Sequence, residues 1–234
     1  MSVYRNELTE RALDAELGER LHHELTSAYA KESEAWATDR MQRVAQQLQS
    51  ERAAANRFIP EILWVDQMTA FAAPGRYLYI TRELLQRLTT DDSAAFVLAH
   101  EIAHHDLGHL ALFRGKRSLL RSLPGSSALA AALLLAEHLL FSPEHETEAD
   151  EYALQLCLEA GYSGPKCMEV FDVLQAHCLD LGDVDMAYGL DEAMLKADEL
   201  DRDWLAGAKL WSWRKMRGYP SLRERKENLL AQMP

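Results

Sequence analysis

The chain has 234 residues, and its 37 acidic and 25 basic side chains give a net charge of −12 at pH 7. This negative balance argues against a nucleic-acid-binding surface, and the length suits one domain with a proper hydrophobic core. The longest apolar run, residues 128–136, is too short to cross a bilayer, which takes about 20 residues.

The first part of the chain is predicted to be helical. Residues 8–55 are highly charged and carry an apolar stripe at helical spacing, of which Leu13, Leu17, Leu21 and Leu25 form the beginning. One long helix or two shorter ones would produce this pattern. We expect a helical N-terminal extension, residues 1–55, followed by the main domain, residues 56–234.

Strand signals follow this helical region. Residues 58–65 are rich in β-forming side chains, and residues 69–75 and 77–81 flank a Pro-Gly turn signal, which predicts a hairpin. Together these segments predict a small antiparallel sheet. The rest of the chain has the pattern of helices, expected at residues 83–88, 93–112, 126–140, 144–160, 165–181, 190–216 and 220–232. The predicted fold class is therefore mainly α, or α+β, with one small sheet.

Two features of the sequence indicate a cytoplasmic protein. Residues 1–11 are polar and charged, unlike a signal peptide. The cysteines at positions 157, 167 and 178 are odd in number and form no C-x-x-C pair, so reduced thiols are expected. No transmembrane segment is predicted, although the apolar run is compatible with peripheral membrane contact.

The helix expected at residues 93–112 contains the motif H-E-x-x-H. His100 and His104 lie four residues apart, so their directions on a helix differ by only about 40° and both imidazoles can reach one metal ion. Glu101 lies beside that face, within reach of a metal-bound water. Zinc hydrolases need this arrangement of ligands, open position and proton-accepting carboxylate. Two histidines that occur by chance on a polar helix would produce the same sequence pattern, so the motif alone does not establish a metal site.

A third ligand is needed, and the acidic segment at residues 144–150 can supply it. Glu146 and Asp150 lie four apart on one helical face, so Glu146 could bind the metal while Asp150 accepts a hydrogen bond from a ligand histidine. An ordinary acidic helix N-terminus would look similar. Spacing alone leaves the alternative ligands open, namely Glu144, Glu146, Glu148 and His145.

A second histidine pair, His105 and His109, forms the pattern H-D-x-x-H in the same helix. The two pairs point in different directions, so both cannot serve one ion. We favour the first pair as ligands and expect His109 to have a structural hydrogen-bonding role.

The sequence resembles the HtpX-type zinc metallopeptidases, a group that includes the CAAX prenyl proteases and the small soluble minigluzincins. The resemblance covers roughly residues 58–229. Four segments carry it: Ala70–Gly75 with the following Glu83-Leu84-Leu85, His100–His104 with His109, the E-x-x-A-D segment Glu146–Asp150, and Pro220-Ser221-Leu222 with Arg225.

The resemblance implies a gluzincin core, a Zn²⁺ cofactor and a role for each matching residue. The metal ligands would be His100, His104 and Glu146. Glu101 would be the general base, Asp150 would support a ligand histidine, and Arg225 would lie near the site and steady either the oxyanion or a structural carboxylate. The segment Ala70, Phe71, Ala72 and Ala73 would be an edge strand along which a peptide or unfolded protein substrate lies.

The sequence departs from the family pattern at Tyr219, where the family often has histidine before the C-terminal proline. We expect the Tyr219 hydroxyl to donate a hydrogen bond to the oxyanion of the reaction. An aromatic side chain packed at a turn is an equally good interpretation.

The resemblance predicts a zinc-dependent metalloendopeptidase, in which Glu101 assists the attack of a zinc-bound water on a peptide bond. The alternative is a zinc-stabilised, latent or inactive module that binds peptides or partners on the same scaffold. The change at Tyr219, and N-terminal helices able to cover the cleft, are compatible with that alternative. The intact Glu101 favours the enzyme, because an inactive relative has no need of a base there.

Overall fold

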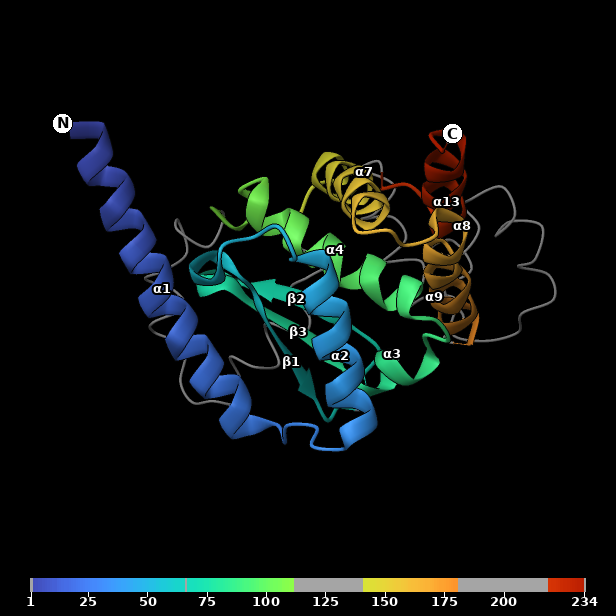
Figure 1. Ribbon diagram of the computed structural model, residues 1–234, viewed down its shortest axis with the longest axis horizontal. Helices are drawn as coiled ribbons and strands as arrows, with labels where there is room; N and C mark the ends of the chain where they lie inside the picture. The colour runs from blue at the N-terminus through green and yellow to red at the C-terminus, as the bar shows by residue number, and fades with distance from the viewer. Residues whose placement is uncertain (1, 66, 112–140, 181–218, 234) are drawn as a thin grey trace, which may run out of the picture.

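A computed structural model describes residues 2–65, 67–111, 141–180 and 219–233 of the chain (Figure 1). The described part is mostly helical with one small sheet, which confirms the predicted fold class in outline. The helices expected at residues 126–140 and 190–216 lie outside the described residues. No helix in the described ranges is long and apolar enough to cross a membrane.

The N-terminal region forms two helices, α1 (Ser2–Ala28) and α2 (Ala35–Leu48). In α2 the buried side chains recur at helical spacing, so one face of the helix packs inwards. Leu21 and Leu25 of α1 and Val44 of α2 are fully buried in the same hydrophobic core as the sheet. Helix α1 from Leu17 onwards and helix α2 therefore share one core with the sheet.

The sheet has three strands, β1 (Ile59–Leu63), β2 (Ala70–Ala73) and β3 (Tyr77–Thr81), in the order β1-β3-β2. The hairpin of β2 and β3 is confirmed, but the expectation of a wholly antiparallel sheet is wrong because β1 pairs with β3 in parallel. Successive strands here reverse direction, so the first and third run the same way. They become neighbours because β3 inserts between the other two.

Helix α1 abuts the hairpin turn η2 (Pro74–Arg76). A side chain at Gly18 would place its Cβ only 2.1 Å from the carbonyl oxygen of Pro74. Any larger residue at position 18 would thus push α1 away from the sheet.

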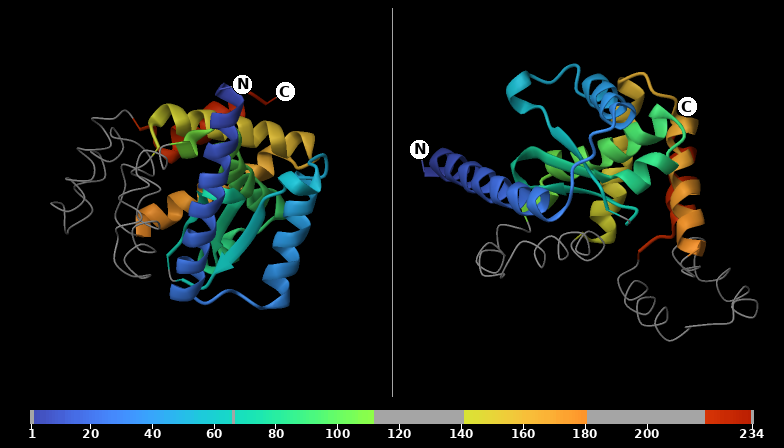
Figure 2. Two further views of the ribbon diagram at one scale, coloured as in Figure 1. Left: turned by 90° about the vertical axis from the view of Figure 1, so that its left-hand side faces the viewer. Right: turned by 90° about the horizontal axis from the view of Figure 1, so that it is seen from below.

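Two short segments lead from the sheet to the central helix. Helix α3 (Arg82–Arg87) is followed by α4 (Asp91–Asp106), where Thr90 caps the first turn by accepting a hydrogen bond from the Ser93 amide. Of the 16 residues in α4, 11 are buried, because α4 lies between the sheet and the C-terminal helices (Figures 1 and 2).

Helix α4 ends earlier than the expected residue 112. Gly108 adopts φ of +77°, a left-handed conformation that glycine tolerates and that commonly terminates helices. The chain then forms the short turn η3 (His109–Ala111). His109 therefore does not continue the helical face that carries His105.

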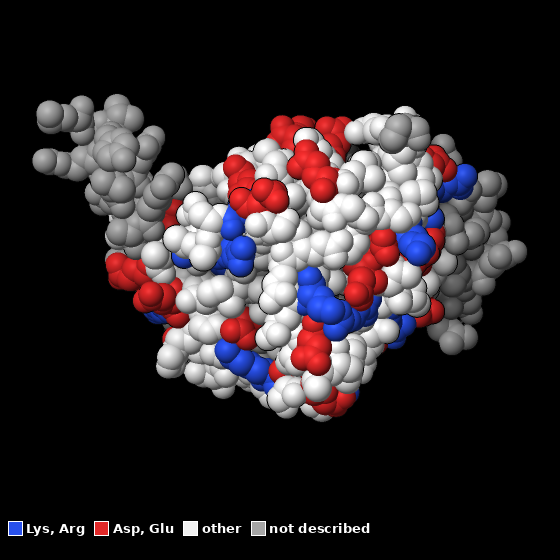
Figure 3. Space-filling model, viewed as in Figure 1, with Lys and Arg blue, Asp and Glu red and all other residues white. Residues whose placement is uncertain are grey.

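The C-terminal helices cover the other side of α4. They are α7 (Pro143–Glu159), α8 (Gly164–Cys167), α9 (Glu169–Asp180) and α13 (Leu222–Ala231), which begins with a capping box of Ser221 and Glu224. Helix α13 packs against α7 and α9. Acidic and basic side chains are interspersed over the face of the molecule shown in Figure 3.

One largely buried arginine ties α2 to the junction of α3 and α4. The Arg40 guanidinium donates hydrogen bonds to the carbonyl oxygens of Leu85 (3.0 Å), Leu88 (2.8 Å) and Thr90, and its Nε lies 2.9 Å from Oδ1 of Asp91. The carbonyls of Leu85 and Leu88 lie where α3 ends, whereas the Thr90 carbonyl belongs to the N-cap of α4 and also accepts the Ala94 amide. Arg40 thereby fixes the point from which α4 starts.

We expect Arg40→Met to lower the free energy of unfolding by about 2 kcal/mol, because several carbonyls and Asp91 lose a largely buried donor. Urea denaturation followed by circular dichroism measures this. Arg43→Met is the matched control: the Arg43 side chain is 62% exposed and lies 3.7 Å from the same Asp91, so its loss should change stability by less than about 0.5 kcal/mol. Equal effects of the two substitutions would contradict the proposed anchoring.

Candidate metal centre

Three side chains from two helices converge on one point. The Nε2 atoms of His100 and His104 lie 3.1 Å apart, and the Glu146 carboxylate oxygens lie 3.6 Å from the first and 3.7 Å from the second. Zinc bonds of about 2.0–2.1 Å in tetrahedral geometry place ligand atoms roughly 3.3 Å apart. Two imidazole nitrogens and one carboxylate oxygen at this spacing fit a zinc ion with one position left open.

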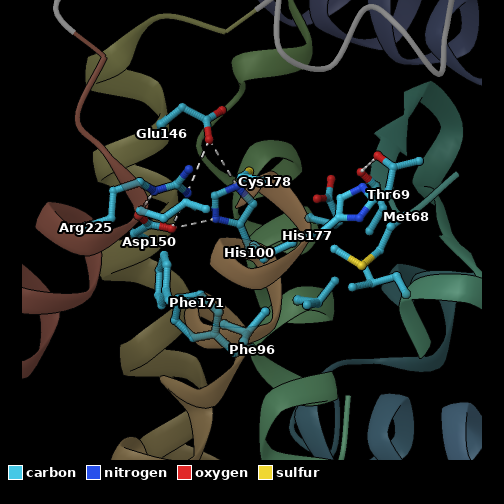
Figure 4. A pocket seen from close by; sticks show the side chains of 17 residues that line it. Met68, Thr69, Phe96, His100, Glu146, Asp150, Phe171, His177, Cys178 and Arg225 are labelled. Atoms are coloured by element: carbon cyan, nitrogen blue, oxygen red, sulfur yellow. Dashed lines mark hydrogen bonds and ion pairs between the residues drawn. The ribbon is translucent and has the colours of Figure 1, made fainter. Parts of the chain in front are cut away.

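His100 is held by a carboxylate behind it. Its Nδ1 lies 3.0 Å from Oδ1 of Asp150, which is 2% exposed (Figure 4). A proton on Nδ1 that is shared with Asp150 leaves the lone pair of Nε2 directed at the metal position. The contact therefore selects the tautomer of His100 that can bind a metal.

Arg225 of α13 keeps Asp150 ionised. Its Nε and Nη2 donate to the two Asp150 oxygens at 2.7 and 2.8 Å, and Nη2 also lies 3.3 Å from Oε2 of Glu146. Burial opposes the ionisation of Asp150 most strongly, but the Arg225 charge and the hydrogen bonds from His100 and Arg225 outweigh it and hold the pKa of Asp150 at about 2. Arg225 thus joins α13 to both acidic side chains of the site.

His104 is supported by a different chain of contacts. Its Nδ1 lies 2.9 Å from Nδ1 of His109, and Nε2 of His109 lies 3.1 Å from Oε2 of Glu148. If His104 binds a metal through Nε2, its Nδ1 carries the proton and His109 accepts it, while the other nitrogen of His109 donates to Glu148. The Phe141 ring stacks on His104 with ring centroids 3.9 Å apart.

The surroundings of His104 keep its imidazole neutral. Burial lowers the pKa of His104 far below its usual value, and the neighbouring His100 adds to this effect. The neutral imidazole is the form that binds metals.

Glu101 follows His100 on α4 and is 3% exposed. It lines the same cavity as His100, Glu146 and Asp150. A carboxylate in the cavity that two of the candidate ligands line is suited to accept a proton from a water molecule bound there.

Comparison with protein-family models gives the family of this chain. The model of peptidase family M48 matches residues 31–231, which run from just before α2 to the end of α13. The chain belongs to peptidase family M48. This confirms the resemblance to the HtpX and CAAX protease group, whose members are metal-dependent peptidases that usually bind zinc. Comparison with curated protein sequences gave no match.

In this M48 chain Tyr219 lies next to the site, but its hydroxyl is not directed at the candidate metal position. The hydroxyl donates a hydrogen bond to the backbone carbonyl of Phe141, the residue whose ring stacks on His104. To stabilise an oxyanion, the Tyr219 hydroxyl would have to give up this hydrogen bond to Phe141 and donate to the oxyanion instead. The observed contact agrees with the alternative interpretation of a packed aromatic at a turn.

Strand β2, which contains Ala70, Phe71, Ala72 and Ala73, lies at one edge of the sheet formed by the described strands. Its four residues are buried, with at most 6% of each exposed, and the strand packs on α4. Their side chains thus belong to the core of this M48 peptidase. A peptide bound at this edge would interact with the backbone of β2.

The sequence left four candidates for the third ligand, and the structure gives different neighbours to three of them. Glu146 joins the two histidines, whereas Glu148 contacts His109. His145 stacks on His109, with ring centroids 4.2 Å apart. Sequence reasoning did not predict the contact of Glu148 with His109 or the stacking of Phe141 on His104. Both contacts join segments that are distant in the sequence, and these segments meet only when α7 packs against α4.

We expect His109→Ala to weaken zinc binding about 10- to 100-fold, since it removes the acceptor that orients His104. Competition between the protein and a chromophoric zinc chelator measures the affinity. His23→Ala is the control, because His23 is exposed on α1 and should leave the affinity unchanged. An unaltered zinc affinity in His109→Ala would show that His104 is positioned without His109.

Proposed function

We propose that this M48 chain is a zinc-dependent endopeptidase that hydrolyses internal bonds of peptides or unfolded proteins. The observation that supports it best is the convergence of His100, His104 and Glu146 on one point, beside a cavity that Glu101 also lines. The proposed zinc, when bound, would supply a Lewis acid that polarises a carbonyl and lowers the pKa of water. We also infer a core of gluzincin type, because the third donor comes from a glutamate on a second helix.

In the proposed reaction Glu101 acts as general base and then as general acid. Its carboxylate takes a proton from the attacking water and delivers it to the leaving amine of the cleaved peptide bond. The 3% exposure of Glu101 limits competing solvation and favours proton transfer to the reacting atoms. The reaction thus regenerates the carboxylate for the next turnover.

Asp150 and Arg225 are proposed to position the ligands. Asp150 holds His100 through Nδ1, and Arg225 holds both Asp150 and Glu146. The bidentate contact of Arg225 with Asp150 supports the structural-carboxylate role over a role at the oxyanion. The loss of either residue should therefore disturb the site as a whole.

The proposed substrate is an extended peptide that adds to the edge of the sheet at β2. Main-chain hydrogen bonds to an edge strand provide affinity with little dependence on sequence. This mode suits unfolded chains, whose backbones are free to pair. Cys157, Cys167 and Cys178 form no disulfide, in keeping with the reducing cytoplasm that we propose as the setting.

Metal analysis combined with a cleavage assay tests the proposed function. We expect roughly one equivalent of zinc per chain, cleavage of an unfolded casein-type substrate, loss of cleavage after chelation, and recovery when zinc is returned. Bound zinc without cleavage would favour the alternative, a binding module on the same scaffold. The absence of zinc binding would contradict both.

A further inference from the structure

A groove lies along α7 and shares no lining residue, in the described part of the chain, with the cavity at the candidate metal centre. On α7 its lining includes Glu148, Glu151, Gln155 and Leu158, which recur every three or four residues and therefore form one stripe along the helix. Its volume is about 560 Å³. This lies within the range of roughly 300–1,000 Å³ that is usual for ligand sites.

Two further helices complete the groove. Leu107, the C-cap residue of α4, and Gln232, the C-cap residue of α13, both line it. Helices α4 and α13 each pack against α7 (Figure 1). The side-chain nitrogen of Gln232 donates a hydrogen bond to Oε1 of Glu151 at 3.1 Å. The ends of two helices are thus held beside the stripe on α7.

The groove has an apolar part that is in contact with water. Leu107 and Leu158 are each 41% exposed, and they are two of the six large apolar residues that the described chain exposes. Leu154 also lines the groove, but it is 4% exposed and belongs to the hydrophobic core. A partner that covers the two exposed leucines would gain free energy by removing their apolar surface from water.

The charged residues of the groove are acidic. Glu148 and Glu151 line it, and no lysine or arginine of the described ranges does. Oε2 of Glu148 lies 3.1 Å from Nε2 of His109, and Oε1 of Glu151 accepts the hydrogen bond from Gln232. A carboxylate has two oxygens with about four acceptor positions, so each acid can also bind a cation. The groove therefore complements positive charge and repels phosphate groups, in a chain whose net charge is −12.

We propose that this groove binds a partner protein through a short basic segment that carries leucine-type side chains together with lysine or arginine. The apolar side chains of the segment cover Leu107 and Leu158, and its cations pair with Glu148 and Glu151. A helical segment with one such face matches a groove whose own stripe follows a helix. The proposal goes beyond the proposed peptidase function and does not depend on it, because no candidate metal ligand lines the groove.

Fluorescence anisotropy with two labelled peptides tests this proposal. The first peptide presents leucine and lysine on one helical face, and the second has glutamate in place of each lysine. Full-length Glu101→Gln protein is used, so that the probes are not consumed by cleavage. We expect the lysine peptide to bind at least about tenfold more tightly than the glutamate peptide, with an affinity that falls as the salt concentration rises.

A pair of charge reversals shows whether the peptide binds in the groove. Glu151→Lys should weaken binding of the lysine peptide about tenfold, because a repulsion replaces an attraction. Glu19→Lys changes the net charge of the chain by the same amount, but Glu19 is exposed on α1 and does not line the groove. Its effect should stay within about twofold. Glu148 is left unchanged, because it also contacts His109.

Leu158→Ala tests the apolar part of the groove and should weaken binding of the lysine peptide about three- to tenfold. Three results would overturn the inference. The first is equal affinity for the lysine and glutamate peptides. The second is an equal effect of Glu151→Lys and Glu19→Lys, which would show only a general attraction to a negatively charged protein. The third is full affinity in Leu158→Ala, because the exposed leucines would then contribute nothing to binding.

Discussion

Glu101→Gln is expected to lower kcat for peptide cleavage by about 10³-fold while the protein still binds zinc. The amide has nearly the same shape as the carboxylate but cannot accept the proton of the attacking water. Glu101 is not among the three side chains whose atoms converge on the metal position, so the ligand set is unchanged. Steady-state cleavage of a quenched fluorescent peptide, together with metal analysis of the same sample, measures both quantities.

The matched control is Glu159→Gln, which makes the same chemical change at an exposed residue near the end of α7. It should retain full activity and zinc content. If Glu101→Gln retained more than a tenth of the wild-type rate, another group would have to be the base. If it lost zinc as well as activity, the role of Glu101 would be structural.

Asp150→Asn is expected to have the largest effect on stability, lowering the free energy of unfolding by about 3 kcal/mol even without metal. The substitution removes the negative charge from a buried pair and leaves the Arg225 guanidinium, whose side chain is 14% exposed, without its bidentate partner. It also removes the acceptor that fixes His100, so zinc affinity should fall about 10- to 100-fold. Urea denaturation of the metal-free protein and competition with a zinc chelator give the two numbers.

Asp172→Asn provides a control at another ion pair with α13, one that is formed from α9. Asp172 pairs with Lys226 of α13, but its side chain is 58% exposed, and exposed ion pairs contribute no more than about 1 kcal/mol. We therefore expect little change in stability and none in zinc affinity. If Asp150→Asn and Asp172→Asn lowered the free energy of unfolding by similar amounts, burial would not explain the contribution of the Asp150–Arg225 pair to stability.

The parts of the site that sequence reasoning could predict are those set by helix geometry. The spacing of His100 and His104 places both imidazoles on one side of α4 whatever surrounds that helix. The same rule puts Glu146 and Asp150 on one face of α7, where Asp150 is buried against α4. The hairpin also follows from local chemistry, because Gly75 takes φ of +79° in the turn.

Local geometry could not choose between Glu146 and Glu148 as the third ligand. The choice depends on how α7 is rotated and placed against α4, and that is decided by the packing of residues such as Ala149 and Ala153, both fully buried. The same packing brings Glu148 to His109. A pattern of residues within one helix contains no information about the distance to another helix.

The sequence by itself determined the candidate site of this protein: the H-E-x-x-H motif, the acid within it and the family features that accompany them. The tertiary structure alone decided the parallel pairing of β1 with β3, the early end of α4, the support of His104 by His109 and the groove along α7. Periodicity and turn signals act within a few residues, whereas these features join segments far apart in the chain. Their positions follow from the packing of the whole core.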